Sequence, residues 1–253
     1  MGSAAPELDD LRDAADRVVS GALSDLITVS AGSLSGYSPS PSRSPSGSPS
    51  GSVQLVVVGP GHPGEFNASG PVSFASFGRD FVVPALVEGQ PSDPTLPTPI
   101  MVARYLASRD IAAHPEHAQL WTSARWTTTS GDGHAKALGE QLAADGTCAG
   151  LILVADGAAC HGPRAPRAQD ARAQAYDAGV CAALASGQPS RLAQIDADLG
   201  DELGATGSQV WPVLVAAADA ADAEGIGEVL WAGAPYGVGW AVASWRRSAA
   251  SAT

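Results

Sequence analysis

The side chains best suited to chemistry gather in two glycine-rich turns, each of which directly follows an apolar run. In the first turn, GPGHPGE at residues 59–65, a histidine and a carboxylate stand three residues apart as His62 and Glu65. The second turn opens with Asp156 and reaches His161 five residues later. Imidazole and carboxylate groups exchange protons near neutral pH, and both bind transition metals. His62, Asp156 and His161 are therefore candidates for acid–base catalysis or for binding a ligand.

The apolar runs before these turns predict buried strands. VQLVVV at residues 53–58 and LILV at residues 151–154 are continuous, short and bounded by turn residues, which is typical of strands buried on both faces. In open α/β sheets, ligands bind outside the carboxyl ends of the strands. Parallel strands end at the same edge, so we expect His62 and His161 to lie on one edge of the sheet.

The remaining pattern alternates strands with helices. Helical spacing of apolar residues predicts helices, and β-branched or aromatic runs predict strands. Helices are expected at about 6–27, 100–107, 133–144, 169–185, 190–203 and 211–221, and further strands at 82–87, 121–129, 228–232 and 238–245. This order predicts an α/β fold, a three-layer α/β/α sandwich around a mostly parallel or mixed sheet. The last two strands favour a mixed sheet.

One domain accounts for the whole length, residues 1–253. A tract of serine, proline and glycine at about 36–52 cannot bury enough apolar surface to offset its ordering entropy, so we expect it to be a disordered insertion. A second histidine-containing segment, His114 to His117, is interrupted by Pro115. We therefore expect it to be a solvent-exposed connection rather than a metal site.

Composition excludes several partners. The net charge is −12, and Lys and Arg together number only 14, so neither nucleic acid nor an anionic membrane surface is an expected partner. No apolar run approaches the roughly 18 residues of a membrane span. Three cysteines without metal-finger spacing fit a reducing cytoplasm. The oligomeric state stays open, with a homo-oligomer allowed.

Several segments together resemble a known family. The series AAPELDDLRDAAD, VVVGPG, SFASFG, LILVADGAA and APYGVGWAVASW resembles actinobacterial proteins related to the LigB-type catalytic subunit of class III extradiol ring-cleavage dioxygenases. The resemblance covers nearly the whole chain apart from the serine/proline tract, and APYGVGW and the Asp-Gly turn are its most specific parts. It implies a mixed α/β/α fold. It also implies oxidative opening of a catechol-type ring with O2 at a non-heme Fe(II) held by two histidines and one glutamate.

The resemblance assigns roles to residues of this chain. His62 takes the place of the second metal histidine, and His161 that of the acid/base histidine, with Asp156 beside it as a second catalytic candidate. For the metal carboxylate, Glu65 is nearest in sequence and Glu202 is nearest to the family's position. No strand precedes the first predicted helix, so the family's first metal histidine has no counterpart here.

The same resemblance implies a small aromatic substrate, and four aromatic residues are candidates to line its pocket: Phe74, Phe77, Tyr236 and Trp240. Two alternatives remain open at this point. The chain can be a catalytically silent relative that binds a small molecule or a partner subunit. It can also be a metal-independent enzyme that uses Cys160 or Asp156 with His161 as base.

Overall fold

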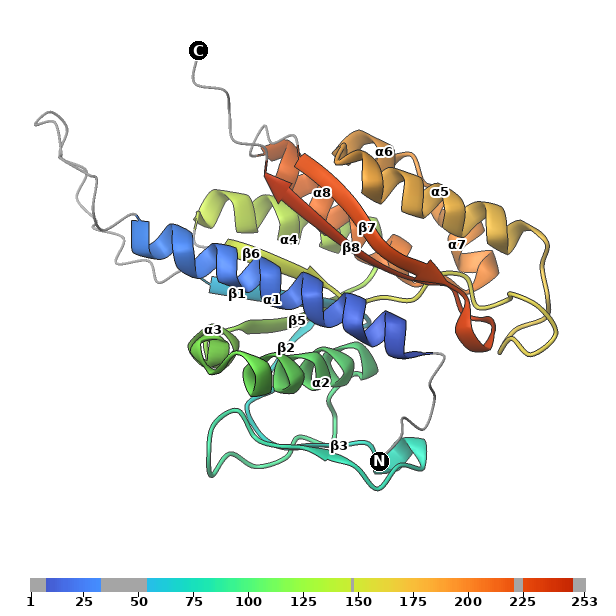
Figure 1. Cartoon of the computed structure of the whole chain (residues 1–253). Helices are drawn as coiled ribbons and strands as arrows, with labels where there is room; N and C mark the ends of the chain where they lie inside the picture. Colours follow the sequence, from blue (N-terminus) through green and yellow to red (C-terminus); the bar gives the residue numbers. More distant parts are fainter. Residues whose placement is uncertain (1–7, 33–53, 147, 221–224, 248–253) are drawn as a thin grey trace, which may run out of the picture.

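The structure is a computed structural model that describes residues 8–32, 54–146, 148–220 and 225–247 (Figure 1). The predicted disordered insertion lies outside these residues. The helices are α1 (Asp9–Gly32), α2 (Thr98–Ala113), α3 (Ala118–Thr122), α4 (Gly131–Asp145), α5 (Arg172–Ser186), α6 (Pro189–Ala193), α7 (Ala197–Leu203) and α8 (Trp211–Ala220). The strands are β1 (Gln54–Pro60), β2 (Gly64–Phe66), β3 (Val72–Ser73), β4 (Val82–Val83), β5 (Arg125–Thr129), β6 (Cys148–Leu153), β7 (Gly225–Gly233) and β8 (Trp240–Arg247). Short 3-10 turns are η2 (Ala75–Phe77), η3 (Pro115–His117), η4 (Gly207–Gln209) and η5 (Pro235–Gly237).

A mixed sheet of strand order β2-β5-β1-β6 forms the centre of the fold. β1 pairs in parallel with β5 and β6, and Val58 lies opposite Thr127 on one side and Leu153 on the other. β2 runs antiparallel to β5. The predicted α/β class with a mixed sheet is thus confirmed, and β1, β5 and β6 end at one edge.

Alternate residues of β1 face two different helical layers. Leu55 and Val57 belong to the apolar cluster that includes residues of α1, α2 and α3. Val56 and Val58 belong to the cluster formed with α4 and α8. A strand that is apolar on both faces can pack against both helical layers, which explains the unbroken run VQLVVV. The helices therefore cover both faces of the sheet, as Figure 1 shows.

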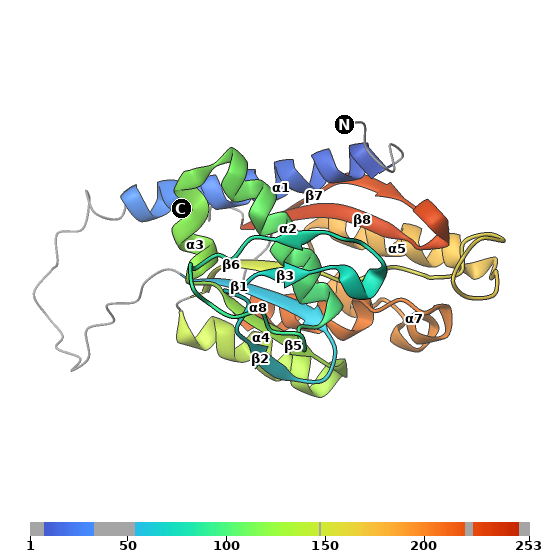
Figure 2. The same ribbon diagram turned by 90° about the horizontal axis from the view of Figure 1, so that it is seen from below.

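β7 and β8 form an antiparallel pair of their own, so the prediction that they make the central sheet mixed is wrong. The pair lies between α1 and α5, and Figure 2 shows it beside both helices. The Trp245 indole N–H donates to the Leu184 carbonyl oxygen of α5, 2.5 Å away. This contact helps to hold the pair over α5 rather than alongside β6.

Two local predictions also need correction. The strand predicted from Trp121 starts only at Arg125, because Trp121 belongs to α3 and stacks on Trp126 at 5.8 Å between ring centroids. His117 is fully buried rather than exposed, since Pro115 starts η3, which brings His117 back against Asp110 of α2. Within the described residues, no helix combines the length and the apolar character that a bilayer crossing requires.

Tyr176 on α5 makes the fold less stable at alkaline pH. Its hydroxyl is buried over Gly200 and has no hydrogen-bond partner among the described residues. Burial, and then the nearby carboxylates of Asp177, Asp201 and Asp196, raises the pKa of Tyr176 to about 12. The folded state thus holds the phenolic proton more tightly than the unfolded chain, whose tyrosine ionises near pH 10. Stability is therefore present below pH 10 and is lost as the pH rises towards 12.

We expect urea unfolding to show this loss, about 1.4 kcal/mol for each pH unit above 10. Tyr176→Phe should remove that fall, because phenylalanine has no proton to release. Tyr105→Phe on α2 serves as the control and should keep it. Equal pH dependence in the Tyr176→Phe variant and in the unaltered protein would contradict the assignment.

Candidate functional site

The candidate site lies beyond the edge at which β1 and β6 end. His62 follows β1 by two residues, and His161 follows β6 by a longer loop. Because β1 and β6 are parallel, the two strands that precede these histidines end at the same edge of the sheet, as predicted. Thr129 ends β5 at this edge as well, and its hydroxyl is hydrogen-bonded to His134 Nδ1 at 2.9 Å.

Backbone hydrogen bonds join the loop after β6 to the turn between β7 and β8. Gly157 N donates to Gly239 O at 2.8 Å, and Gly239 N donates to Ala158 O at 2.7 Å. His161 N donates to Gly237 O at 3.0 Å. The Asp-Gly turn and the APYGVGW segment, far apart in sequence, thus form one continuous structure.

A histidine–aspartate pair is the chemical centre of this structure. His161 Nε2 is 2.6 Å from Asp177 Oδ2, and both side chains are less than a fifth exposed, at 17% and 19%. The other carboxylate oxygen accepts the Ala158 N–H at 3.0 Å. A carboxylate only accepts hydrogen bonds, so Nε2 carries the proton and Nδ1 presents a lone pair. Among the described residues Nδ1 has no hydrogen-bond partner, so it is the nitrogen that can act as base.

Two glycines allow the close approach on which this pair depends. A Cβ atom on Gly239 would overlap Asp177 Oδ2. A Cβ atom on Gly157 would lie 2.6 Å from Gly239 O and 2.8 Å from Asp177 Oδ1. Neither glycine has a positive φ, so the requirement is for space and not for backbone freedom. The His161–Asp177 contact in this geometry therefore requires glycine at both position 157 and position 239.

Asp156 is held in place by its backbone. Its carbonyl oxygen accepts from the N–H groups of Thr206 and Gly207 at 2.9 and 3.2 Å. Its own N–H donates to Thr206 Oγ1 at 2.9 Å. Desolvation by the surrounding residues raises the pKa of the Asp156 carboxyl, and the indole N–H of Trp240 acts in the opposite direction. Since Asp156 is exposed to solvent, water screening limits this shift.

The aromatic candidates divide into two groups. Tyr236 lies in the turn that is bonded to the His161 loop, and Trp240 begins β8 directly after this turn. The Trp240 indole N–H is buried, and no acceptor within the described chain meets it in hydrogen-bond geometry. Tyr236 is 53% exposed and has a φ of 55°. This backbone conformation is uncommon for residues other than glycine, and such conformations cluster at functional sites.

Phe74 and Phe77 lie in a different cluster. The Phe74 ring packs against Phe81 and Phe77 with centroid separations of 5.8 and 6.0 Å. Phe81 in turn packs against Tyr105 of α2. In the described part of the chain these rings contact one another and α2, whereas the His161 loop contacts Tyr236's turn. The structure therefore brings together two of the four predicted aromatic residues at His161.

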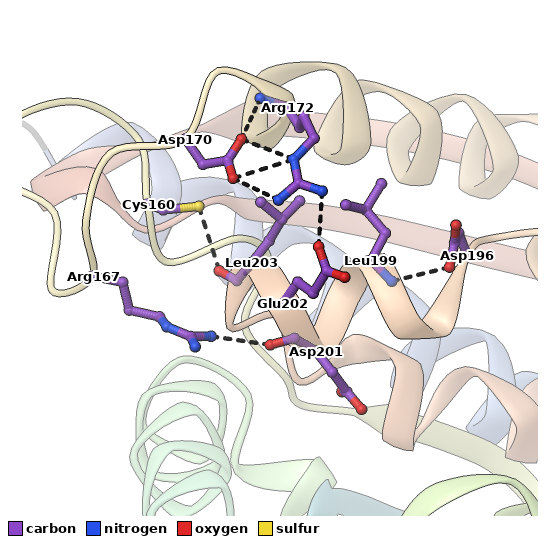
Figure 3. A network of polar contacts seen from close by, with 9 residues as sticks. All are labelled: Cys160, Arg167, Asp170, Arg172, Asp196, Leu199, Asp201, Glu202 and Leu203. Carbon is purple, nitrogen blue, oxygen red and sulfur yellow. Dashed lines mark hydrogen bonds and ion pairs between the residues drawn. The ribbon is translucent and has the colours of Figure 1, made fainter.

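The carboxylates proposed as metal ligands are both paired with arginine. Glu65 on β2 is exposed and lies 2.6 Å from Arg125 Nη2. Glu202 lies 2.8 Å from Arg172 Nη1, as Figure 3 shows. Across residues 8–32, 54–146, 148–220 and 225–247, no group of three or more His, Cys, Asp or Glu side chains is placed to hold a metal ion. The described donor set does not fit Fe(II) held by two histidines and a glutamate.

The rest of the loop after β6 is fastened to α7. Arg172 also binds Asp170 through two nitrogens, and Arg167 Nη1 donates to the Asp201 carbonyl oxygen at 3.0 Å (Figure 3). Cys160 is buried, and its thiol lies 3.5 Å from Leu203 O. Burial raises the pKa of the Cys160 thiol, which lowers the fraction of reactive thiolate. This environment suits a structural cysteine and not a nucleophile.

Asp177 is the residue that sequence reasoning missed. It stands one residue after Tyr176 on α5, sixteen positions beyond His161, in the segment YDAGVCAAL that contributes to the resemblance, but no pattern in the sequence assigned it a role. No known protein-family model matches the chain, and no curated protein matches it. The geometry of the site therefore carries the functional argument.

Proposed function

We propose that this protein is extradiol-dioxygenase-like and binds a catechol-type phenol at the carboxyl edge of its sheet, where His161 exchanges the phenolic proton. The observation that carries the proposal is the 2.6 Å hydrogen bond between His161 Nε2 and Asp177. It orients the ring and leaves Nδ1 as the base. A general base must lie within hydrogen-bond reach of the proton that it takes.

In this proposal the phenol hydroxyl donates to His161 Nδ1. Asp177 stabilises the imidazolium that forms when the proton moves, because the carboxylate lies against the opposite ring nitrogen. The Trp240 indole N–H is buried and acts on the Asp156 carboxyl, so Trp240 offers its ring and not a free donor to the bound phenol. The exposed Tyr236 ring gives an aromatic surface beside it.

Oxidative ring opening is the further activity that the resemblance implies. Iron would activate O2 and the catecholate in such a reaction. The ligand set does not fit, since Glu65 and Glu202 are engaged by Arg125 and Arg172, and we derive no step through iron. This observation favours a second candidate, a catalytically silent small-molecule-binding or partner subunit with the same fold.

All three cysteines are free thiols, which supports a cytoplasmic location.

Titration with 4-nitrocatechol under argon tests the proposal, because this phenol changes colour when it loses a proton. We expect saturable binding with the absorption of the phenolate. His161→Ala should weaken binding by about tenfold or more, as expected for loss of a charge-assisted hydrogen bond, and should abolish the colour change. His62→Ala is the matched control and should bind normally without metal. Absence of binding to the unaltered protein would refute the proposal.

A second measurement separates the two candidates. Fe(II) is added anaerobically, the catechol follows, and O2 uptake is recorded on mixing with air. Uptake that is lost in His62→Ala supports ring opening. Binding of the phenol without O2 uptake supports the silent binding protein.

A further inference from the structure

A second group of polar side chains lies far along the chain from His161, where α1 packs against α2 and η3. Its members are hydrogen-bonded to one another inside an otherwise apolar cluster. They are Ser20 and Ser24 of α1, Asp110 of α2, His117 of η3 and Trp121 of α3. None of them takes part in the function proposed above.

We propose that Ser24, His117 and Asp110 form a second reactive centre, in which Ser24 is a nucleophile for acyl transfer from small activated esters. Nucleophilic catalysis by serine needs a base within hydrogen-bond reach and a third group that orients the base. Ser24 Oγ lies 3.3 Å from His117 Nε2. His117 Nδ1 lies 2.9 Å from Asp110 Oδ2.

The direction of these hydrogen bonds is the one that the chemistry needs. The Asp110 carboxylate only accepts, so the proton of the imidazole is on Nδ1. Nε2 then has a free lone pair, and the Ser24 hydroxyl is the group that can donate to it. The imidazole is thus positioned to take the Ser24 proton when the oxygen attacks.

Asp110 is a positioning residue that is itself fixed. The Trp121 indole N–H donates to its Oδ2 at 2.8 Å, and the Ser20 hydroxyl donates to its Oδ1 at 2.8 Å. Asp110 is only 2% exposed. These contacts fix the carboxylate, which in turn holds His117 Nδ1 in one orientation.

The nucleophile is accessible although the base is not. His117 is fully buried, and the His114 ring stacks on it with centroids 5.1 Å apart. Ser24 lies on the exposed side of α1. One turn earlier, a Cβ atom on Gly21 would meet nothing of the described chain within 4 Å. A small acyl group can therefore approach the Ser24 hydroxyl from the solvent side of α1.

The proposed reaction is balanced without a redox partner. Ser24 Oγ attacks the acyl carbon and its proton passes to His117 Nε2. The ester C–O bond breaks, the imidazolium gives the proton to the leaving oxygen, and an alcohol departs. Water then attacks acyl-Ser24 by the same route, which releases a carboxylic acid and restores the serine.

The same hydrogen bonds would exist if the network only tied α1 to α2, and the two serines distinguish these roles. Ser20 and Ser24 stand one turn apart on α1, and each donates to one member of the network. Only Ser24 contacts the histidine. Ser20→Ala and Ser24→Ala each remove one hydroxyl, so their effects on unfolding should be similar while their effects on reactivity should differ.

The test uses the full chain, an alkyl fluorophosphonate with peptide mapping, and p-nitrophenyl acetate. We expect the fluorophosphonate to modify Ser24 about a hundredfold faster than Ser20, in line with the effect of a positioned general base. Release of p-nitrophenol should fall to the buffer rate in Ser24→Ala and persist in Ser20→Ala. Equal labelling of the two serines, or unchanged ester hydrolysis in Ser24→Ala, would overturn the proposal and leave the network a structural tie.

Discussion

Replacing Asp110 with alanine is expected to lower the free energy of unfolding by about 3–5 kcal/mol, because two buried donors lose their acceptor and each such loss costs about 1–3 kcal/mol. The carboxylate accepts hydrogen bonds from His117, Trp121 and Ser20. His117 and Trp121 are fully buried, so water cannot replace the missing acceptor. The melting temperature should fall by about 10 °C, because one kcal/mol moves a domain of this size by roughly 2–4 °C.

Circular dichroism during heating measures this change. Glu116→Ala is the control, since Glu116 lies in the same turn as His117 but its side chain is 62% exposed. Its effect should stay within about 0.5 kcal/mol. A loss below about 1 kcal/mol in Asp110→Ala would mean that water or a rearranged side chain satisfies the network.

Gly239→Ala is expected to damage both stability and ligand binding through a single methyl group. The added Cβ would overlap Asp177 Oδ2 and lie 2.6 Å from Asp177 Cγ, so the carboxylate must move away from His161. Overpacking of this kind costs about 1–3 kcal/mol. Binding of 4-nitrocatechol should weaken by about tenfold, the same loss that is expected for His161→Ala.

Gly179→Ala provides the matched control on the helix that carries Asp177. A Cβ atom at Gly179 would meet nothing within 4 Å. In a helix interior, alanine is favoured over glycine by about 1 kcal/mol, so this variant should be slightly more stable and should bind the phenol normally. Unchanged binding in Gly239→Ala, measured beside this control, would show that the His161–Asp177 contact does not orient the base.

β1, β5 and β6 of the central sheet were predicted, and β1 was the clearest because burial on both faces leaves an unbroken apolar run, whereas the short edge strand β2 was not predicted. β1 packs on helices at both faces, so almost all of its residues are apolar and the run stands out. The β7–β8 pair was predicted as two strands but not as a separate sheet. Strand pairing depends on which surfaces α1 and α5 leave available, and this is decided by packing between segments far apart in the chain.

The site was predictable only in part for a similar reason. His161 and the turn with Tyr236 and Trp240 were found, since glycine turns after apolar runs mark strand ends. Asp177 was not found, because its position opposite His161 depends on how α5 returns to the loop after β6. His117 was placed in solvent, because its burial depends on the three-residue turn that Pro115 begins. Contacts of this kind depend on how the chain folds back on itself, so the sequence around each residue does not reveal them.

The position of α1 has a consequence for how the protein is made. α1 packs against α2, β6, β7 and β8, so its surroundings come from almost the full length of the described chain. A ribosome adds about 5–20 residues each second, and β7 and β8 are the last of these elements to emerge. The apolar side of α1 therefore stays partly uncovered until β7 and β8 have been made. We expect nascent chains halted before β7 to bind holding chaperones through α1.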